Sequence, residues 1–546
     1  MCQGAFVVFK HLTQNHMDFI KRTFPLLFGI FLISVVVRLP ELNRPLSKHH
    51  EFCTSISLRT MQIWYDNGIE KYGYNPVMTF NNPADKYINN SANASGKMVD
   101  SSGNFYYVSH PPFAYYFPFA IFKILRIRPA VLPLQILNLI FHFISGLFVY
   151  FMVCLLSFNR ARSLPYRPAV VAFVVYTFLP VTMWFQGNVY MSDMAVHLLF
   201  IIGVYTALKM IIREKFYSPK YIFLYTVCLA LMLYTSWLGV FFATGIVIYS
   251  LLRLHANKGF NVLLWITVIT SILMLRLITY QYSQINGVEA YLSEMFNRYI
   301  QRGSLEGTDQ GIFHFMFSYL WLIKTLLYNY VIHYIVVYLI IGLFMYLAAS
   351  RKKLKIVFSE NGYRFIWLSV LPVLLLHFFF LNYSVQDFTA LYASLFFSVL
   401  LGILYDKVKK SGAVPIRALQ IGLVVTVVIL VGQYYLMNYR LDTHFAQVVG
   451  EDIIAKNSTK EDVIFWPNEQ VEPQLVFYAQ RNIKYIKSTD DARAFLVKHG
   501  LKQGVIFYVR DRGYSFQKVT PDAEGPILEG GINNGSANLD PGKQHN

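Results

Sequence analysis

The sequence predicts a polytopic α-helical membrane protein that ends in a small α/β domain outside the bilayer. Apolar side chains make up 55% of the 546 residues and aromatic side chains 17%, an unusually apolar and aromatic composition. Apolar runs of helical length recur through residues 1–438, which we assign to one transmembrane domain. Short β-rich runs then alternate with helical stretches in residues 439–525. Chemistry is therefore expected in the polar segments that the apolar runs leave.

About eleven apolar runs are long enough to cross a bilayer, which requires roughly 20 residues in a helix. Within a long polar loop, 39–130, the stretch 113–125 is apolar but short and ends among Lys123, Arg126 and Arg128. We expect this stretch to form a helix that lies in the outer membrane interface. The expected spans are 24–38, 131–158, 168–185, 191–212, 220–236, 237–252, 262–280, 328–349, 364–381, 389–405 and 416–437.

The basic residues indicate the orientation of these spans. With the N-terminus in the cytoplasm, all five cytoplasmic loops are basic: NRARSLPYR, REKFYSPK, RLHANKG, SRKKLKI and DKVKKSG. Topology therefore explains most of the net charge of +18, and no nucleic acid partner is expected. Loop 39–130 and the block after residue 438 then lie on the exoplasmic side. Because eukaryotic targeting signals are lacking, we predict a bacterial inner membrane.

The C-terminal block, 439–525, is expected to form a separate exoplasmic α/β domain. EDVIFW, NIKYI and GVIFYV are the expected strands, and helices are expected near PQLVFYAQR and DDARAFLVKHG. No Gly-rich phosphate loop follows any of these strands, so nucleotide binding is not predicted. The tail 526–546 is rich in Gly and Asn and is expected to be disordered.

Two histidines and a glutamate follow the first span, in the segment PLSKHHEFCTS. His49, His50 and Glu51 have three interpretations: a metal site, an acid/base device, or the polar collar of a membrane helix. Adjacent residues rarely converge on one ion, and no HExxH spacing or Cys pair lies nearby, so no dedicated metal site is predicted. The other two interpretations stay open on the residues alone.

Three more polar residues fall on the same predicted face of the membrane. Asp193 begins a span in GNVYMSD, where an acid is hydrated, paired or functional, although a plain helix N-cap beside Ser192 explains it equally well. His110 precedes two prolines that fix an extended turn, so its ring reaches a site or caps the turn. Asp387, in NYSVQDFTALY, hydrogen-bonds in a cavity or caps a helix near Thr389.

Exoplasmic cations supply candidate ligands for a phosphate group, because guanidinium groups pair well with phosphate oxygens. The candidates are Arg59, Arg298 and Arg302, with Lys123 and Arg126 as further possibilities. Arg298 and Arg302 are four residues apart in YLSEMFNRYIQRG and would share one face of a helix. Contact with lipid headgroups is the alternative for these residues.

The order of these features resembles the GT-C glycosyltransferases. The features are an acid at the start of a long exoplasmic loop, HPP before an aromatic-rich helix, the helix LQILNLIFHFISGLFVYFMV, and the acid in FLPVTMWFQGNVYMSD. The pattern looks most like family 39, which holds protein O-mannosyltransferases and lipid A aminoarabinose transferases. This resemblance implies a GT-C fold, a polyprenyl-phosphate-linked sugar as donor, exoplasmic transfer and inversion at the anomeric carbon. It implies no cofactor and no catalytic metal.

The resemblance also implies roles for individual residues. The family has an Asp-Glu pair in its first loop, and here His50 and Glu51 take that place. Glu51 is then the candidate base that removes the proton of the acceptor hydroxyl. His50 would share the proton, orient Glu51 or contact the donor phosphate. Asp193 matches the family's acid at the head of a helix and is expected to contact donor or acceptor.

Two other classes of function remain as alternatives to a transferase that acts on a protein, lipid or glycan acceptor. The first is a transporter or flippase for lipid-linked sugars, which usually has ionisable residues near the membrane midplane and repeated halves. Here the acids lie at the outer ends of the spans, and no internal repeat is visible. The second is a non-catalytic assembly protein of the cell envelope. Membrane lipids are expected partners in every case.

Overall fold

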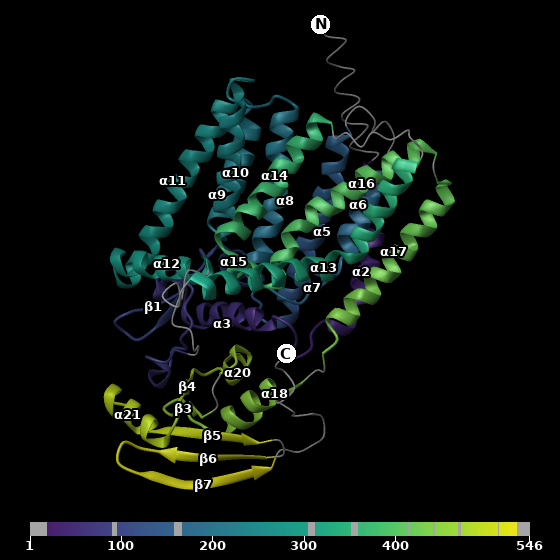
Figure 1. Ribbon diagram of the computed structural model, residues 1–546. Helices are drawn as coiled ribbons and strands as arrows, with labels where there is room; N and C mark the ends of the chain where they lie inside the picture. Colours follow the sequence, from purple (N-terminus) through teal and green to yellow (C-terminus); the bar gives the residue numbers. More distant parts are fainter. Residues whose placement is uncertain are drawn as a thin grey trace.

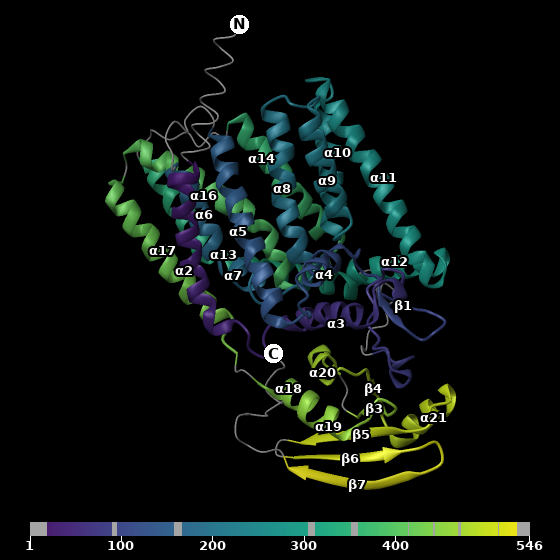
Figure 2. The ribbon, with the colours of Figure 1, turned by 180° about the vertical axis from the view of Figure 1, so that it is seen from behind.

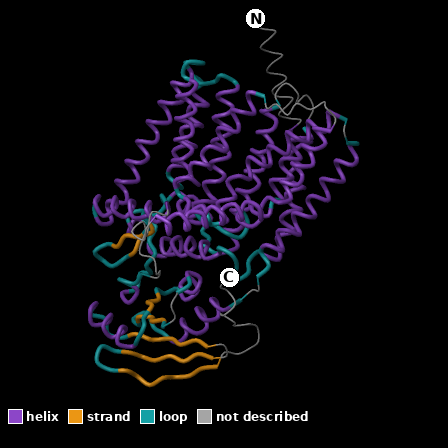
Figure 3. Tube along the Cα trace, in the orientation of Figure 1, coloured by secondary structure: helices purple, strands orange, loops and turns teal. Residues whose placement is uncertain are grey.

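The computed structural model describes residues 19–89, 96–157, 166–303, 312–350, 359–412, 414–440, 443–467, 471–510 and 513–531. Long helices form a bundle, shorter helices lie across one end of it, and a small sheet domain follows on that same side (Figures 1 and 3). The predicted helical membrane protein with a C-terminal sheet domain is confirmed.

Among the described residues, a helix forms in each of the eleven stretches that were expected to span the membrane. Within the described ranges, eight helices are long and apolar enough to cross a membrane, and α6, α9 and α10 are shorter apolar helices of the bundle (Figure 2). The helices are α2 (Phe24–Arg38), α5 (Val131–Leu156), α6 (Arg167–Phe178), α8 (Ser192–Ile212), α9 (Pro219–Leu233), α10 (Trp237–Arg253), α11 (Gly259–Asn286), α13 (Ile312–Ser350), α14 (Glu360–Phe379), α16 (Ser394–Ser411) and α17 (Ile416–Met437).

Some boundaries differ from the expected ones for local reasons. The expected span 168–185 is broken, because Leu179 is extended, with ψ 131°, before Pro180 and a short helix α7 (Pro180–Phe185) follows. The span expected at 389–405 begins as a 3₁₀ turn, Asp387–Ala393, and continues as α16. The helix α13 is much longer than the expected 328–349.

Three helices lie across the end of the bundle that faces the sheet domain. They are α3 (Glu51–Asn67), α4 (Phe113–Leu125) and α12 (Val288–Gly303) (Figures 1 and 2). The helix expected at 113–125 forms with those bounds. α3 was not predicted as a helix, because its polar and apolar residues follow no membrane-like run. A short strand pair, β1 (Lys97–Val99) and β2 (Phe105–Tyr107), lies beside these helices.

The C-terminal domain contains one five-stranded sheet of order β4-β3-β5-β6-β7. The predicted strands are β3 (Val463–Trp466), β4 (Ile483–Tyr485) and β5 (Gly504–Arg510), which pair in parallel, and the predicted helices are α20 (Pro473–Ala479) and α21 (Thr489–His499). An antiparallel hairpin of β6 (Gly513–Val519) and β7 (Glu524–Gly531) was not predicted. β7 corrects the expectation that disorder begins at residue 526, whereas 532–546 lie outside the described residues.

The sheet domain is tied to loop 39–130 by buried polar contacts and by a shared apolar core. Arg481 Nε lies 3.2 Å from both carboxylate oxygens of Asp85, which is fully buried, and the backbone N–H of Asn482 donates to Asp85 Oδ1 at 2.8 Å. One cluster of buried apolar residues joins Leu58 and Trp64 of α3 to Leu475 and other residues of α20. α20 is thereby packed against α3, at the edge of the candidate site.

Candidate functional site

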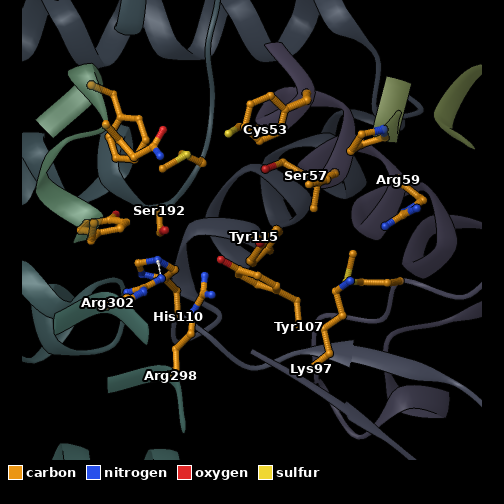
Figure 4. A pocket seen from close by; sticks show the side chains of 18 of the residues that line it. Cys53, Ser57, Arg59, Lys97, Tyr107, His110, Tyr115, Ser192, Arg298 and Arg302 are labelled. Carbon is orange, nitrogen blue, oxygen red and sulfur yellow. Dashed lines mark hydrogen bonds between the residues drawn. The ribbon is translucent and has the colours of Figure 1, made fainter. Parts of the chain in front are cut away.

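A cavity of about 510 Å³ lies where α3, α4, α12 and the start of α8 meet α20 (Figure 4). Its lining contains four cations and His110 but no carboxylate. The lining residues are Phe52, Cys53, Ile56, Ser57, Arg59, Met78, Lys97, Tyr107, His110, Tyr115, Met191, Ser192, Arg298, Gln301, Arg302, Asn382, Tyr383, Gln386, Phe388 and Pro473. The cavity therefore has a positive, partly aromatic wall.

Two arginines of α12 form one side of this wall. Arg298 Nε donates to Ser109 Oγ at 2.6 Å, and Arg302 Nη2 donates to the same oxygen at 2.9 Å. The two arginines thus share a helix face, as their spacing predicts. Arg302 is only 3% exposed, and its Nε and Nη1 atoms have no hydrogen-bond partner in the described part of the chain. These unpaired donors are suited to bind an anion.

His110 completes this side of the cavity as a neutral group. Its Nε2 lies 2.8 Å from Arg302 Nη2, which can only donate, so the His110 proton is on Nδ1. Burial, followed by the charges of Arg302 and Arg298, holds the pKa of His110 well below its ordinary value. The ring therefore adds a hydrogen-bond acceptor and no charge of its own, whereas the buried Asp193 carboxylate favours the charged form of Arg302.

Arg59 and Lys97 lie on another side of the cavity (Figure 4). Arg59, in α3, is 1% exposed, and burial lowers its pKa to about 10. Lys97, in β1, donates to Asn89 Oδ1 at 2.9 Å. Burial, followed by the charges of Arg59 and Arg298, lowers the pKa of Lys97 to about 7. The sequence analysis named Arg59 but missed Lys97, since nothing in the sequence places a loop lysine beside α3.

Asp193 lies directly behind the wall at the first turn of α8. It is fully buried and accepts hydrogen bonds from the hydroxyls of Tyr383 and Tyr392. Tyr383 and Ser192 line the cavity, so one hydroxyl separates the Asp193 carboxylate from the cavity. The Arg302 guanidinium carbon lies 4.4 Å from the centre of the Tyr383 ring. Sequence reasoning missed Tyr383, which lies 190 residues away from Asp193 along the chain.

Glu51 does not line the cavity. It is 1% exposed, and its carboxylate accepts hydrogen bonds from Arg44 Nη1 at 3.0 Å and Nη2 at 2.5 Å. The backbone N–H groups of Ser47 and Lys48 donate to its Oε2 at 2.9 and 2.8 Å. Burial raises the pKa of Glu51, although Arg44 opposes the shift. These contacts fix the loop before α3 and turn the carboxylate toward that loop.

His49 and His50 meet Asp387 across 338 and 337 residues of sequence, behind the cavity residues Gln386 and Phe388. Their Nε2 atoms lie 2.6 and 2.8 Å from the two Asp387 oxygens, and His333 Nε2 lies 3.7 Å from one of them. One ligand atom from each of His49, His50 and Asp387 lies within 4.8 Å of the others. Such a set could hold a metal ion, which the adjacent histidines alone did not indicate.

The structure thus brings Arg59, Arg298, Arg302 and His110 into one cavity and places Asp193 one hydrogen bond behind it. His49, His50 and Asp387 form a neighbouring cluster, and Glu51 belongs to the loop before α3. Lys123 and Arg126 are exposed outside the cavity, where Lys123 Nζ lies 4.8 Å from the centre of the Tyr65 ring. The roles predicted for all of these residues remain predictions.

Solved structures with a similar arrangement of the chain were found at low sequence identity. The archaeal oligosaccharyltransferase AglB from Archaeoglobus fulgidus, in complex with an inhibitory peptide and a dolichol-phosphate, is 11% identical with a TM-score of 0.55, covering 90% of this chain and 70% of AglB. ArnT from Cupriavidus metallidurans, bound to undecaprenyl phosphate, is 10% identical with a TM-score of 0.53, covering 89% of this chain and 93% of ArnT. The chain has the GT-C fold.

The fold is recognised by comparison with solved structures, because no family model and no curated protein matches the sequence. The apo form of the Archaeoglobus fulgidus oligosaccharyltransferase gives a similar result, with 12% identity and a TM-score of 0.54 over 89% of this chain and 70% of that enzyme. At such identities, likeness establishes the fold, and chemistry has to be argued from the site. The assignment to family 39 within the GT-C proteins stays a prediction.

Proposed function

We propose that this GT-C protein is a membrane glycosyltransferase that moves a sugar from a polyprenyl-phosphate donor to an acceptor hydroxyl, with inversion. The observation that carries the proposal is the positive cavity beside the membrane helices, in which Arg302 has buried donors without a partner among the described residues. Two structures of the same fold contain a dolichol-phosphate or undecaprenyl phosphate, which supports this donor class. We place the reaction on the exoplasmic side of a bacterial inner membrane.

The donor phosphate would be held by α12. Arg302 offers Nε and Nη1, and Arg298 lies beside it on the shared Ser109 hydroxyl. The bond between the anomeric carbon and the phosphate oxygen breaks during transfer, and the electron pair stays on the leaving phosphate. Guanidinium groups in a buried site stabilise that developing charge without large rearrangement. Because His110 is neutral, its contact with Arg302 places no counter-charge there.

Asp193 is the acid that the geometry favours as the proton acceptor. Burial and the Asp193 charge hold the pKa of Tyr383 well above its ordinary value, so the hydroxyl keeps its proton and donates it to Asp193. As the acceptor oxygen bonds to the anomeric carbon, its proton would pass to the Tyr383 oxygen, and the Tyr383 proton to Asp193. Glu51, the base expected from the resemblance, would instead act as a positioning residue through Arg44 and the loop before α3.

The test follows the consumption of a panel of polyprenyl-phosphate sugars by purified protein in lipid nanodiscs, with protein, lipid and glycan acceptors supplied. We expect Asp193→Asn to lower kcat by about 10²–10⁴-fold, the usual range for loss of a general base. Tyr383→Phe should lower it similarly, while Asp66→Asn, on the exposed side of α3, should not.

The Glu51→Gln variant separates the two candidate bases. We expect it to lower the unfolding temperature and to lose activity in proportion to the folded fraction. Glu51 would again be the base if Glu51→Gln folded fully but had no turnover while Asp193→Asn stayed active. If no donor is consumed but lipid-linked sugar crosses the bilayer intact, the protein is a flippase. If neither happens, an assembly role replaces both functions.

A further inference from the structure

We propose that Arg59 and Lys97 form a second anion subsite in the cavity, which binds a carboxylate or phosphate group of the substrate other than the donor phosphate. The inference deepens the proposed function and rests on it, because it concerns what kind of sugar or acceptor the same cavity takes.

Arg59 is the strongest reason for this subsite. Its guanidinium is 1% exposed and lines the cavity, yet Nε and Nη1 have no hydrogen-bond partner, and no ion pair to Arg59 is found among the described residues. Removing an arginine charge from water costs several kcal/mol unless an opposite charge or hydrogen bonds compensate it. A buried cation that faces a cavity without a counter-ion is therefore built for an anionic ligand.

Lys97 adds a second positive charge to the same place. It lines the cavity and donates a hydrogen bond to Asn89, and the charges of Arg59 and Arg298 both disfavour its protonation. Like charges brought together in a buried site repel, and an anion bound between them would relieve that repulsion. The cavity lining contains no Asp or Glu that would offset them.

The charge of the donor phosphate does not account for all these cations. A phosphodiester carries a single negative charge, and Arg298 with Arg302 already presents two guanidinium groups that share Ser109. Figure 4 shows Arg59 and Lys97 on one side of the cavity and Arg302 and Ser192 on the other. The rings of Tyr107 and Tyr115 lie between the two sides. A sugar seated on these rings would extend from one cationic group to the other.

The substrate class that fits is therefore an acidic one. The anionic group belongs either to the transferred sugar, as in a uronic acid, or to the acceptor, as in a phosphorylated or carboxylated glycan. Both sources present the same oxygen atoms to Arg59 and Lys97, so binding experiments with matched ligands have to distinguish them.

The donor-side experiment measures binding of glucuronic acid 1-phosphate and glucose 1-phosphate to the full-length protein in detergent by isothermal titration calorimetry. The acceptor-side experiment compares methyl glucuronide and glucose 6-phosphate with methyl glucoside, in the presence of undecaprenyl phosphate. In one of the two comparisons, wild type should bind the acidic ligand at least about tenfold more tightly than the neutral partner, the usual size of a charged hydrogen-bond contribution. The comparison that shows the preference identifies the source of the anion.

Variants test whether the preference arises at the proposed subsite. Arg59→Met and Lys97→Gln should each remove most of the preference, and Arg59→Lys should keep part of it. Arg302→Gln should weaken both sugar phosphates equally and leave the preference intact, so loss of the donor phosphate site and loss of the second subsite are separable. An equal affinity for acidic and neutral ligands in both comparisons overturns the proposal, as does a preference that both variants retain.

Stability without ligand distinguishes a binding arginine from a structural one. If Arg59 had a structural role, replacing it would break contacts and destabilise the protein. If it is a buried charge without a partner, replacing it relieves a desolvation cost. We therefore expect the unfolding temperature of Arg59→Met to equal or exceed that of wild type in the absence of ligand. Inorganic phosphate should raise the unfolding temperature of wild type more than that of Arg59→Met. Two results together would contradict the assignment. One is a strongly lowered unfolding temperature of Arg59→Met, and the other is a Lys97→Gln variant that inorganic phosphate stabilises as much as it stabilises wild type.

Discussion

At the scale of single residues, burial decides which groups around the cavity carry charge. His110 is kept neutral by burial and by two arginines, so it accepts a hydrogen bond from Arg302. A lysine ammonium is normally charged at neutral pH, unlike a histidine ring. In Lys97, burial lowers the pKa to about 7. The same physical cause thus removes a charge from His110 and makes the charge of Lys97 dependent on pH.

The lowered pKa of Lys97 predicts selective chemical modification. Near neutral pH and without a bound anion, a substantial share of Lys97 side chains is neutral and nucleophilic, whereas an ordinary lysine, with a pKa of about 10.4, is almost wholly protonated. Acetylation with acetic anhydride at pH 7.5, followed by peptide mass spectrometry, should modify Lys97 at least about tenfold faster than exposed Lys498. The rate at Lys97 should fall as the pH drops below 6, where Lys97 is protonated, and inorganic phosphate should slow the reaction. The advantage over Lys498 should shrink as the pH rises toward about 10, where ordinary lysines also lose their proton. Equal rates at pH 7.5 would contradict the lowered pKa.

At the scale of elements, the cavity depends on how α20 and the sheet domain are held against α3. The buried pair of Asp85 and Arg481 is central to this, because Arg481 also donates to the backbone carbonyls of Thr459 and Asp462. Arg481 therefore holds Asp85 of loop 39–130 and two backbone carbonyls of the C-terminal domain at the same time. Leu46 N donates to the Tyr478 hydroxyl at 2.8 Å, which joins α20 to the loop before α3.

Replacing Asp85 should release the C-terminal domain. Asp85→Ala leaves Arg481 buried without its partner, which typically costs about 3–5 kcal/mol. We expect a lower unfolding temperature and faster cleavage by trypsin between α17 and β3, followed on gels. Asp452→Ala, which removes an exposed ion pair with Lys456, serves as the matched control and should behave like wild type. A resistant Asp85→Ala protein would show that the apolar contacts alone hold the domain.

The sequence predicted the helices better than the site, and the reason is physical. A membrane span needs a local apolar run, so α5 or α17 is visible in the sequence itself. The break at Pro180 was also readable in principle, because proline restricts the residue before it. The pairing of His50 with Asp387 and of Asp193 with Tyr383 depends on long-range packing, which no local pattern encodes.

The β6–β7 hairpin and the environment of Glu51 were missed for different reasons. β6 and β7 are partly exposed strands with mixed polar and apolar residues, so their sequences lack the apolar runs that identified β3 and β5. Glu51 has the residue type of a base, but its partners Arg44, Ser47 and Lys48 lie within seven residues. That local pairing could have been considered from the sequence, because Arg44 precedes the acid in the same polar loop.

At the scale of the whole molecule, the ends of the bundle differ. The cavity, α3, α12 and the C-terminal domain lie at one end, and the loops 213–218 and 254–258 connect helices at the other (Figures 1 and 2). Basic loops are retained in the cytoplasm, so the cavity and the sheet domain are expected on the exoplasmic side.

This orientation can be checked with single cysteines in a protein whose native cysteines are replaced by alanine. Val497→Cys in α21 and Tyr217→Cys in the loop 213–218 start from similarly exposed side chains, 64% and 67%. A membrane-impermeant maleimide applied to intact spheroplasts should label the cysteine at 497 and spare the one at 217, and permeabilisation should make both reactive. The reverse pattern would place the cavity in the cytoplasm and exclude an exoplasmic transferase.

Pro473 of α20 belongs to the cavity wall, although the last membrane helix, α17, ends at Met437. During synthesis, every membrane helix is therefore made before the wall is complete. A chain that stops after α17 would lack the part of the cavity wall that contains Pro473. Its cavity would be more open to water, which screens the charges of the cations that line it. The order of the chain thus leaves the cavity wall incomplete until α20 has been synthesised, although Arg298 and Arg302 of α12 are already present.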